Sequence, residues 1–438
     1  MKPKTTTQKL LASSKEAVRP FYLRWLYFPL FPARFPSHFS DCWNFPISDP
    51  PPPAAGAGPD ILFLPMTDWH TRIQRTQHLA RAFASRGQRC FYVNPHLGRE
   101  FPKPYIFTTT PLLCQIEPNI AELHIHLPRE PVFHDRLLST GEADRILSGF
   151  RETVARTGSR HMVQIVSFPL WTEVARRIRD EFGFPIVYDC HDVLAGFRNI
   201  APEIVDAEAE LFSLSNLVLF SAEPLLETHL RQFSDLQSRS LLVRNAVDER
   251  WLALARDSTP HPEKIAGYVG ALDFWFDVDA VEQAAIQYPD WKFLLIGRVE
   301  DERVRRLEAL PNVVFQGEVA HSELHTYLER FRVALIPFIR NELTMGTNPI
   351  KLYEYFSYGL PVIASRLPEL EQFGDLVYLS ESPAGFVEQL GKASTETAVG
   401  TNKDPRSIRR RQVANQETWT ARIEQLSAAF ETLIAASS

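Results

Sequence analysis

The sequence predicts an α/β protein with two doubly wound, Rossmann-like domains that face each other across a cleft. The chain has 438 residues, which is too long for one ordinary hydrophobic core. From Asp60 onward, short apolar runs alternate with helical stretches, as in a parallel sheet covered by helices on both faces. The same alternation begins again at Ile265, after a break near residues 244–248. These observations together favour two similar domains in one chain.

The first half contains six candidate strands separated by helical stretches. The helix that begins near Arg72 is expected to end at Gly87, because glycine is the preferred residue just past a helix. The strand candidates are residues 61–66, 90–93, 163–167, 186–189, 217–221 and 241–243, and helix candidates include residues 72–86, 171–182 and 203–213.

The second half repeats this order. Its strand candidates are residues 265–270, 292–297, 313–315, 333–337 and 361–364, and its helix candidates are residues 279–288, 300–309, 321–330 and 349–358. A final helical stretch follows at residues 406–434. We therefore expect four parts, which are an arm with a Pro/Ala/Gly linker (1–58), a first domain (59–245), a second domain (246–405) and a C-terminal helix (406–438) that packs back toward the first domain.

Composition and charge are those of a globular protein that does not span a membrane. Hydrophobic residues make up 45% of the chain and charged residues 23%. The formal net charge of −6 argues against a general nucleic-acid-binding protein. We find neither an apolar run of the roughly 18 residues that a transmembrane helix needs nor the apolar core of a signal peptide. The cysteines lack zinc-ligand and redox spacing, so we expect reduced thiols in a cytoplasmic protein at Cys42, Cys90, Cys114 and Cys190.

The N-terminal arm differs from the rest of the chain. Residues 1–40 hold seven Lys or Arg and one acidic residue, a net charge of +6. Residues 19–36 combine arginines with aromatic residues and prolines, a composition that suits a membrane interface. Two alternatives follow. The arm contacts the inner face of a membrane peripherally through residues 19–36, or it packs on the protein or is partly disordered.

The most informative stretch is residues 348–365, where a helix with signals at both ends precedes a buried strand. Asn348 is a preferred N-cap residue, and Pro349 suits the first helical position. Gly359 is the residue expected just past the end of the helix.

One residue of this helix goes against the local rule. Lys351 lies in the first turn, where the helix dipole disfavours a cation, and a bound anion would remove the conflict. Glu354 lies three residues later on the same face. A lysine for phosphate and a carboxylate for hydroxyl groups suit a nucleoside diphosphate. The alternative is a surface helix with an ordinary Lys–Glu pair.

With these motifs, the second half resembles the donor-nucleotide domain of GT-B glycosyltransferases, in particular the large bacterial retaining family of glycosyl transferases group 1. The resemblance covers most of residues 60–435, strongly in the second half and weakly in the first. The matching stretches are residues 267–272 with 276–277, 291–297, 314–319 and 348–365, and residues 244–248 resemble the family's crossing between domains.

The resemblance implies a donor site for a nucleotide-diphosphate sugar that needs no metal and no further cofactor. Lys351 would hold the diphosphate with backbone N–H groups of residues 347–350, and Glu354 would accept hydrogen bonds from the ribose. Backbone groups of residues 317–319 would pair with the base. The donor-site residues expected in this way are Gly270, Arg298, Gly317, Val319, Glu342, Gly346, Thr347, Asn348, Lys351 and Glu354.

The chain departs from the family pattern at two places. The family often has a glutamate that touches the donor sugar eight positions before Glu354, and this position is Gly346, so Glu342 is the candidate replacement. The family often also has an arginine and a lysine after the first strand of this domain. Here residues 273–277 contain no cation, and Arg298 or Arg340 could supply the charge.

In the first half, three polar residues lie at the end of the strand at 186–189. Asp189, His191 and Asp192 resemble the family's strand-end His-Asp, where the histidine lies beside the donor sugar. His191 could bond the sugar, and Asp189 or Asp192 could act as a base or orient His191. The alternative is that Asp192 caps the next helix and His191 is an ordinary satisfied polar residue.

A second polar group follows the first strand of the first domain. Trp69, His70, Arg72 and Arg75 place cations at the start of a helix, against its dipole. They could bind an anionic acceptor such as a lipid diphosphate or an acidic sugar, and the alternative is a solvated first turn.

Other motifs are absent or weak. Asp277 and Asp279 have the spacing of a metal-binding pair, but we expect Asp279 to cap a helix. No G-x-G-x-x-G follows the first strand of either domain, which argues against a nicotinamide or flavin enzyme. Neither a Walker lysine motif nor a G-x-S-x-G elbow occurs.

Two classes of function remain. The resemblance implies metal-independent, retaining transfer of a sugar from a nucleotide-diphosphate sugar to a saccharide or lipid-linked acceptor, in cell-envelope polysaccharide or glycolipid synthesis. The alternative is a catalytically weak or inactive nucleotide-binding module of a membrane-associated biosynthetic assembly. Nucleic acid is an expected partner in neither class.

Overall fold

The computed structural model describes residues 49–52, 58–70, 72–95, 111–125, 127, 134–198, 200–257, 263–396 and 404–437. The arm at residues 19–36 and Cys42 lie outside these ranges. Within them, no helix combines the length and the apolar character that crossing a bilayer requires. The chain forms two compact units. The first takes the described residues of 1–189, 199–217 and 428–438, and the second takes those of 190–198 and 218–427.

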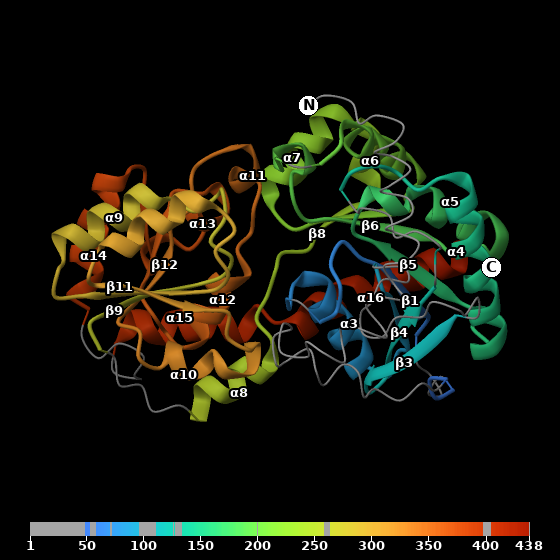
Figure 1. The fold of residues 1–438 in the computed structure, drawn as a ribbon. Coiled ribbons are helices and arrows are strands. Elements are labelled where there is room, and N and C mark those ends of the chain that lie inside the picture. The colour runs from blue at the N-terminus through green and yellow to red at the C-terminus, as the bar shows by residue number, and fades with distance from the viewer. Residues whose placement is uncertain are drawn as a thin grey trace, which may run out of the picture. The chain divides into compact units, whose positions relative to one another are not determined.

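The first sheet is mainly parallel and has eight strands in the order β3-β4-β2-β1-β5-β6-β7-β8 (Figure 1). Strand β1 pairs in parallel with β2 and with β5, so that Ile61 lies opposite Cys90 on one side and Val163 on the other. The strands are β1 (Asp60–Leu64), β2 (Cys90–Val93), β3 (Leu112–Glu117), β4 (Ile120–His124), β5 (Met162–Val166), β6 (Ile186–Cys190), β7 (Leu217–Phe220) and β8 (Ser240–Leu242).

The edge hairpin β3–β4 was not among the strands expected from the sequence. Its two strands are antiparallel, and Asn119 in the turn between them has φ +61°. Strand β4 carries Glu122 and His124 as fully or almost fully buried residues. Buried polar residues in a strand hide the apolar pattern by which strands are recognised.

Helices cover both faces of this sheet (Figure 1). The longest, α4, begins with a capping box in which Ser139 and Glu142 exchange hydrogen bonds, and it ends at Gly158 with φ +63°. The helices of this half of the chain are α3 (Arg75–Ser85), α4 (Thr140–Thr157), α5 (Thr172–Phe182), α6 (Pro202–Leu214), α7 (Glu223–Gln232) and α8 (Glu249–Asp257), with short 3₁₀ turns at Pro169–Trp171, Leu194–Gly196 and Ser234–Ser238.

The second sheet has six strands in the order β11-β10-β9-β12-β13-β14. The paired strands run parallel throughout, as in a doubly wound sheet. The strand order is built outward in one direction from β9 to β11 and in the other from β12 to β14, so the order reverses between β9 and β12. The strands are β9 (Ile265–Val269), β10 (Lys292–Ile296), β11 (Val313–Gly317), β12 (Val333–Ile336), β13 (Val362–Ser365) and β14 (Val377–Ser380).

Helices α9 and α14 cover one face of the second sheet, and α12 and α15 cover the other (Figure 1). The helices are α9 (Val278–Gln287), α10 (His325–Leu328), α11 (Glu342–Met345), α12 (Ile350–Ser357), α13 (Pro368–Glu371), α14 (Pro383–Ser394), α15 (Pro405–Gln416) and α16 (Trp419–Ser437), with 3₁₀ turns at Glu302–Ala309, His321–Glu323 and Gly374–Leu376.

Three expectations about these helices were wrong. The stretch at 302–309 is a 3₁₀ helix, in which Arg305 pairs with Glu302 and Glu308 at a spacing of three residues. Asp277, rather than Asp279, caps α9 by accepting a hydrogen bond from the N–H of Ala280. The final stretch is two helices, because the backbone of Glu417 and Trp419 pairs with Val247 and interrupts the helix.

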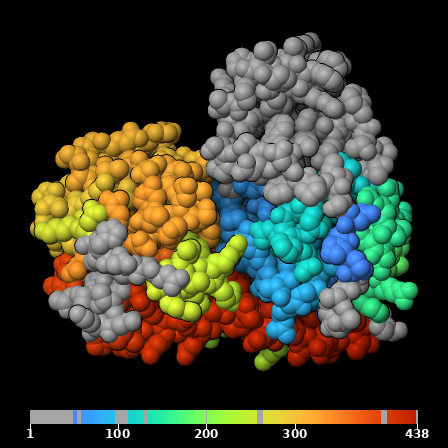
Figure 2. Space-filling view, turned by 90° about the horizontal axis from the view of Figure 1, so that it is seen from below, coloured from blue at the N-terminus to red at the C-terminus, as the bar shows by residue number. Residues whose placement is uncertain are grey.

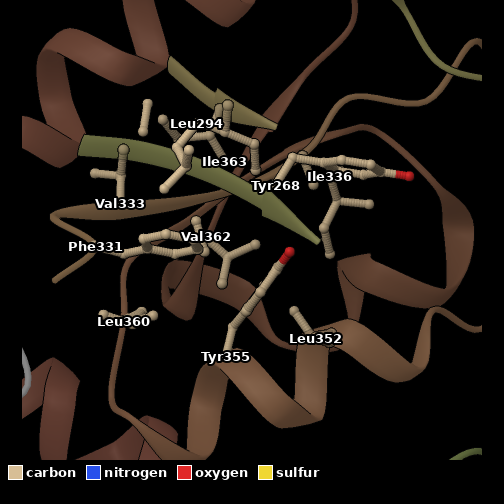
Figure 3. Packing of buried hydrophobic residues seen from close by; sticks show 14 of the residues in the cluster. Tyr268, Leu294, Phe331, Val333, Ile336, Leu352, Tyr355, Leu360, Val362 and Ile363 are labelled. Atoms are coloured by element: carbon tan, nitrogen blue, oxygen red, sulfur yellow. The ribbon is translucent and has the colours of Figure 1, made fainter. Parts of the chain in front are cut away.

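Apolar side chains from the second sheet and α12 form one core (Figure 3). Leu352 and Tyr355 point from α12 toward the strands, and both are fully buried. The hydroxyl of Tyr355 accepts a hydrogen bond of 2.9 Å from the N–H of Val269, at the end of β9. Helix α12 is therefore fixed beside the carboxyl end of β9.

Helices α15 and α16 are the last two helices of the chain, and their surface is drawn in red in Figure 2. Helix α16 buries Trp419, Ile423, Leu426 and Phe430. In the first unit, the ring of Phe430 stacks on Phe83 of α3 with centroids 5.4 Å apart.

Candidate functional site

Lys351 lies at the reversal point of the second sheet. Its Nζ is 5.2 Å from the ring centre of Tyr268 on β9 and 4.9 Å from that of Phe338, just after β12. Gly270 has φ +146°, and a Cβ atom there would lie 3.1 Å from Nζ. Glycine at position 270 therefore gives the ammonium its room. In open α/β sheets, ligands bind at this place, outside the carboxyl ends of the strands.

The surroundings of Lys351 favour a bound anion. Burial lowers the pKa of its ammonium to about 8, although the nearby carboxylate of Glu354 raises it. In the first turn of α12, the N–H of Leu352 donates to the carbonyl of Pro349 at 3.1 Å, whereas those of Ile350 and Lys351 make no hydrogen bond to the described residues. An ammonium and open N–H groups in a poorly solvated place attract phosphate more strongly than they would in water.

Glu354 is almost fully buried one turn later and has a histidine beside it. The Nε2 atom of His321 lies 3.4 Å from Oε1 of Glu354, and the His321 ring lies 5.1 Å from the ring of Trp251. Sequence reasoning missed His321, because it is 33 residues away from Glu354 and only the fold brings the two together.

Asn348 does not cap α12 as expected, because Pro349 occupies the N-cap position and no side chain caps the helix. The Asn348 amide instead donates to the hydroxyl of Tyr353 at 3.1 Å and to the carboxylate of Glu369 at 3.0 Å. Its carbonyl accepts a bond of 2.5 Å from the side chain of Asn245. Asn348 therefore fixes the start of α12 through these hydrogen bonds. The expected end of the helix is confirmed, since Gly359 follows it with φ +67°.

Glu369 links these hydrogen bonds to the chain near residue 244. Its Oε2 atom also accepts a hydrogen bond of 2.9 Å from Nε of Arg244, and the side chain of Glu369 is 1% exposed. The resemblance of residues 244–248 to a domain-crossing signature did not predict this contact, because Glu369 lies 125 positions away from Arg244.

The loop before α12 is closely packed. The Thr347 hydroxyl donates to the carbonyl of Leu343 at 2.9 Å, and its N–H donates to Thr344, so this N–H is not open to a ligand. A Cβ atom on Gly346 would lie 2.7 Å from Cγ2 of Val193. Val193 therefore fills the space that a side chain at position 346 would need. Glu342 lies at the exposed start of α11.

The remaining donor-site candidates lie at the carboxyl ends of β10 and β11. Gly317 is exposed and has φ +75°, and its carbonyl accepts a bond of 2.8 Å from the N–H of Gly297. Val319 is half-buried. Arg298 is 59% exposed and pairs with Glu300, which neutralises its charge. The base-pairing role of 317–319 stays a prediction.

Arg340 lines a different feature, a cavity of about 100 Å³ at the carboxyl ends of β12 to β14. Phe338 lines both this cavity and the surroundings of Lys351.

The loop after β6 carries His191 and Asp192 and belongs to the second unit. The Nε2 atom of His191 lies 3.9 Å from a carboxylate oxygen of Asp192, and the His191 carbonyl accepts a bond of 2.9 Å from the hydroxyl of Ser221. The same loop touches α11, since a Cβ atom on Gly196 would lie 2.8 Å from Cβ of Leu343. The fold therefore places His191 and Asp192 in the unit that holds Lys351.

Asp189 and Arg75 bind each other in the first unit. The Nε atom of Arg75 donates to both carboxylate oxygens of Asp189, at 2.9 and 3.1 Å, and Asp189 is fully buried. A buried carboxylate paired in this way is poorly placed to act as a base, and the same pairing uses the charge that Arg75 was expected to offer to an acceptor.

The other acceptor-side candidates are mostly in the interior. Trp69 is 5% exposed, and the guanidinium of Arg81 lies 5.1 Å from its ring centre. Nε2 of His70 lies 3.0 Å from Oε2 of Glu122. Arg72 is half-buried, and its carbonyl accepts a bond of 2.7 Å from Gln77. The alternative of a solvated first turn is wrong for Trp69, His70 and Arg75.

A buried polar cluster that the sequence did not reveal surrounds Glu122. Its carboxylate binds His70, His124 at 3.1 Å and the amide of Asn94 at 2.9 Å. Burial raises the pKa of Glu122, but the two histidines lower it by more, so that the pKa lies well below its usual range. Burial lowers the pKa of His124, and the pull of Glu122 outweighs this and raises it to about 9. Glu122 and His124 are therefore an ion pair at neutral pH.

The part of the chain around Lys351 also matches known proteins. Residues 263–396 match the family of glycosyl transferases group 1. This segment contains β9 to β14 and α12, and so includes Lys351, Glu354 and the reversal point. The expected resemblance is confirmed for this part of the chain.

A curated relative extends the match. The chain is 23% identical over 267 residues to "Putative teichuronic acid biosynthesis glycosyltransferase TuaH" of Bacillus subtilis (strain 168). The alignment covers 55% of this chain and 65% of the relative, so the chain matches a little under two thirds of that protein's length.

Solved structures confirm the predicted fold class of two Rossmann-like domains. Sucrose-phosphate synthase from Thermosynechococcus elongatus superposes with a TM-score of 0.66 at 18% identity, covering 86% of this chain and 100% of that one. Anabaena Alr3699/HepE in complex with UDP and glucose gives 0.60 at 12% identity, covering 85% and 99%. A glycosyltransferase from Rickettsia africae ESF-5 gives 0.64 at 10% identity, covering 86% and 98%. At these identities the similarity shows the fold alone.

Proposed function

We propose that this protein is a glycosyltransferase that moves a sugar from a nucleotide-diphosphate sugar to a saccharide or lipid-linked acceptor. The observation that carries the proposal is the position of Lys351 at the sheet reversal of the matched domain, beside Gly270 and one turn from Glu354. The relative named for teichuronic acid biosynthesis favours cell-envelope polysaccharide or glycolipid synthesis as the setting.

The proposed chemistry depends on charge stabilisation of the leaving diphosphate. As the bond between sugar and phosphate breaks, negative charge grows on the diphosphate, and Lys351 with the N–H groups of α12 would stabilise it without a metal. Glu354 would accept hydrogen bonds from the ribose, and His191 with Asp192 would bind the donor sugar. We keep the family's retaining outcome as part of the proposal.

The deciding experiment measures nucleotide binding by calorimetry, with UDP, GDP, ADP and dTDP as probes. Lys351→Ala should weaken the preferred diphosphate at least about tenfold, because hydrogen bonds to charged groups are worth about 1.5–3 kcal/mol. Lys264→Ala is the matched control, since Lys264 is 65% exposed and pairs with Asp290 in the same unit. Equal affinity of wild type and Lys351→Ala would refute the assigned site.

Transfer itself separates the two classes of function. A screen of nucleotide sugars, with saccharide and lipid-linked acceptors and with EDTA present, should release nucleoside diphosphate and form a product of retained anomeric configuration. Binding without hydrolysis or transfer across the screen would support the inactive module instead. The observation that favours this second candidate is the close packing of Val193 on Gly346, because it leaves no space for the family's glutamate at this position.

We also propose peripheral contact with a membrane surface through residues 19–36. Liposome flotation of the full chain and of a variant lacking residues 1–58 tests this contact, and equal flotation would contradict it.

A further inference from the structure

We propose that Arg198 is the second cation of the donor site and binds the diphosphate together with Lys351. This inference rests on the proposed function and adds a residue to it that comes from the loop after β6. The loop after β9, where a cation is expected, carries Asp273, Phe274 and Trp275 instead.

Arg198 lies over that loop. Its guanidinium carbon is 4.6 Å from the ring centre of Phe274, within cation–π distance. Residues 190–198 belong to the second unit, although they follow a strand of the first sheet. The loop after β9 begins at Gly270, beside the ammonium of Lys351, so both cations lie at the same edge of the second sheet.

The charge of Arg198 is not used up by its neighbours. Nη1 of Arg198 lies 3.6 Å from Asp301, beyond hydrogen-bond distance, and Arg198 makes no hydrogen bond to the residues that the structure describes. Asp301 is already held by Arg303, which donates from Nε to both carboxylate oxygens at 3.1 Å. Hydrogen bonds from Arg303 lower the pKa of Asp301, and Arg198 adds a smaller attraction. Two arginines therefore share one carboxylate, which leaves one positive charge in excess.

The geometry of Arg198 suits a phosphate group. Stacking on Phe274 orients the planar guanidinium, and its N–H fork can bind two oxygens of one phosphate. The Arg198 side chain is 59% exposed, so a ligand can reach it without a rearrangement of the core. Arg305 is similarly exposed, at 51%, but pairs with Glu302 and Glu308, so the two arginines differ mainly in whether the charge is neutralised.

The test compares Arg198→Gln, Arg198→Lys and the control Arg305→Gln by calorimetry. The probes are inorganic pyrophosphate, the nucleoside diphosphate that wild type binds most tightly among UDP, GDP, ADP and dTDP, and the corresponding monophosphate. We expect Arg198→Gln to weaken the diphosphate about tenfold and the monophosphate less than about twofold, because one charged hydrogen-bonding group to the second phosphate is lost.

The controls make the outcome decisive. Arg198→Lys should recover part of the affinity, since it keeps the charge but loses the fork, and Arg305→Gln should stay within about twofold of wild type. Melting temperatures check that the variants are folded. Arg198→Gln with unchanged diphosphate affinity, or with equal losses for monophosphate and diphosphate, would overturn the role of Arg198 alone. Failure of wild type to bind any diphosphate or pyrophosphate would instead overturn the proposed function.

Discussion

Lys351 shows how one residue can signal a site both in the sequence and in the structure. In the sequence it is a cation where the helix dipole disfavours one, and in the fold it is a half-buried ammonium between the rings of Tyr268 and Phe338. Burial lowers its pKa to about 8, so the ammonium is charged at neutral pH and loses its proton as the pH rises through about 8.

This pKa predicts how diphosphate binding depends on pH. The charged ammonium, present below about pH 8, binds the anion, so the dissociation constant should rise toward tenfold per pH unit above that value. Calorimetry between about pH 6.5 and 9.5, in buffers of different ionisation enthalpy, measures the affinity and the accompanying proton uptake. Lys351→Arg is the control, because arginine stays charged and should remove the dependence. A flat wild-type profile would contradict the role of the ammonium.

At the scale of elements, the loop after β6 packs so closely on the segment around α11 that two glycines, one in each, have no space for a side chain. A Cβ atom on Gly196 would lie 2.9 Å from the backbone nitrogen of Leu343, and one on Gly346 would lie 2.7 Å from Val193. This packing gives a physical reason why glycine occupies position 346, where the family often has a glutamate.

Gly196→Ala should therefore lower the free energy of unfolding by about 1–3 kcal/mol, because the backbone of Leu343 cannot move aside as a side chain could. Urea denaturation measures this change. Gly141→Ala in α4 is the matched control, since nothing lies within 4 Å of its added Cβ, and it should be neutral or slightly stabilising. Equal stability of the two variants would show that the loop is not held in this way.

The parts of the fold that were predictable are those with local signals. Continuous apolar strands, Gly359 after α12 and the Lys351–Glu354 pair could all be found from neighbouring residues. The unpredicted parts depend on contacts between distant residues. Asp189 meets Arg75 across 114 positions, and this pairing, invisible in the sequence, argues against the roles expected of both residues. Asn348 was expected to cap α12, but Pro349 takes the N-cap position and Asn348 bonds Glu369, 21 positions away.

At the scale of the whole molecule, helix α16 contributes to both compact units. Its first residues, from Trp419 on, belong to the second unit, and residues from Ala428 on belong to the first. Phe430 lies in the latter part and is 2% exposed, and its ring stacks on Phe83. Lys351 belongs to the second unit, so the aromatic stack and the donor site depend on different sets of contacts.

Phe430→Ala should therefore destabilise the protein without changing the donor site. The loss of a buried aromatic ring costs about 3–5 kcal/mol, and denaturant unfolding measures this loss. Diphosphate affinity, measured by calorimetry where the variant is still folded, should stay within about twofold of wild type, because no contact of Lys351 or Glu354 involves Phe430 among the described residues. Lys351→Ala should show the converse pattern, with weakened binding and little change in the stability of the first unit. If Phe430→Ala weakened diphosphate binding tenfold while the fold persisted, the two units would be energetically coupled through α16, and the donor site could not be explained by the second unit alone.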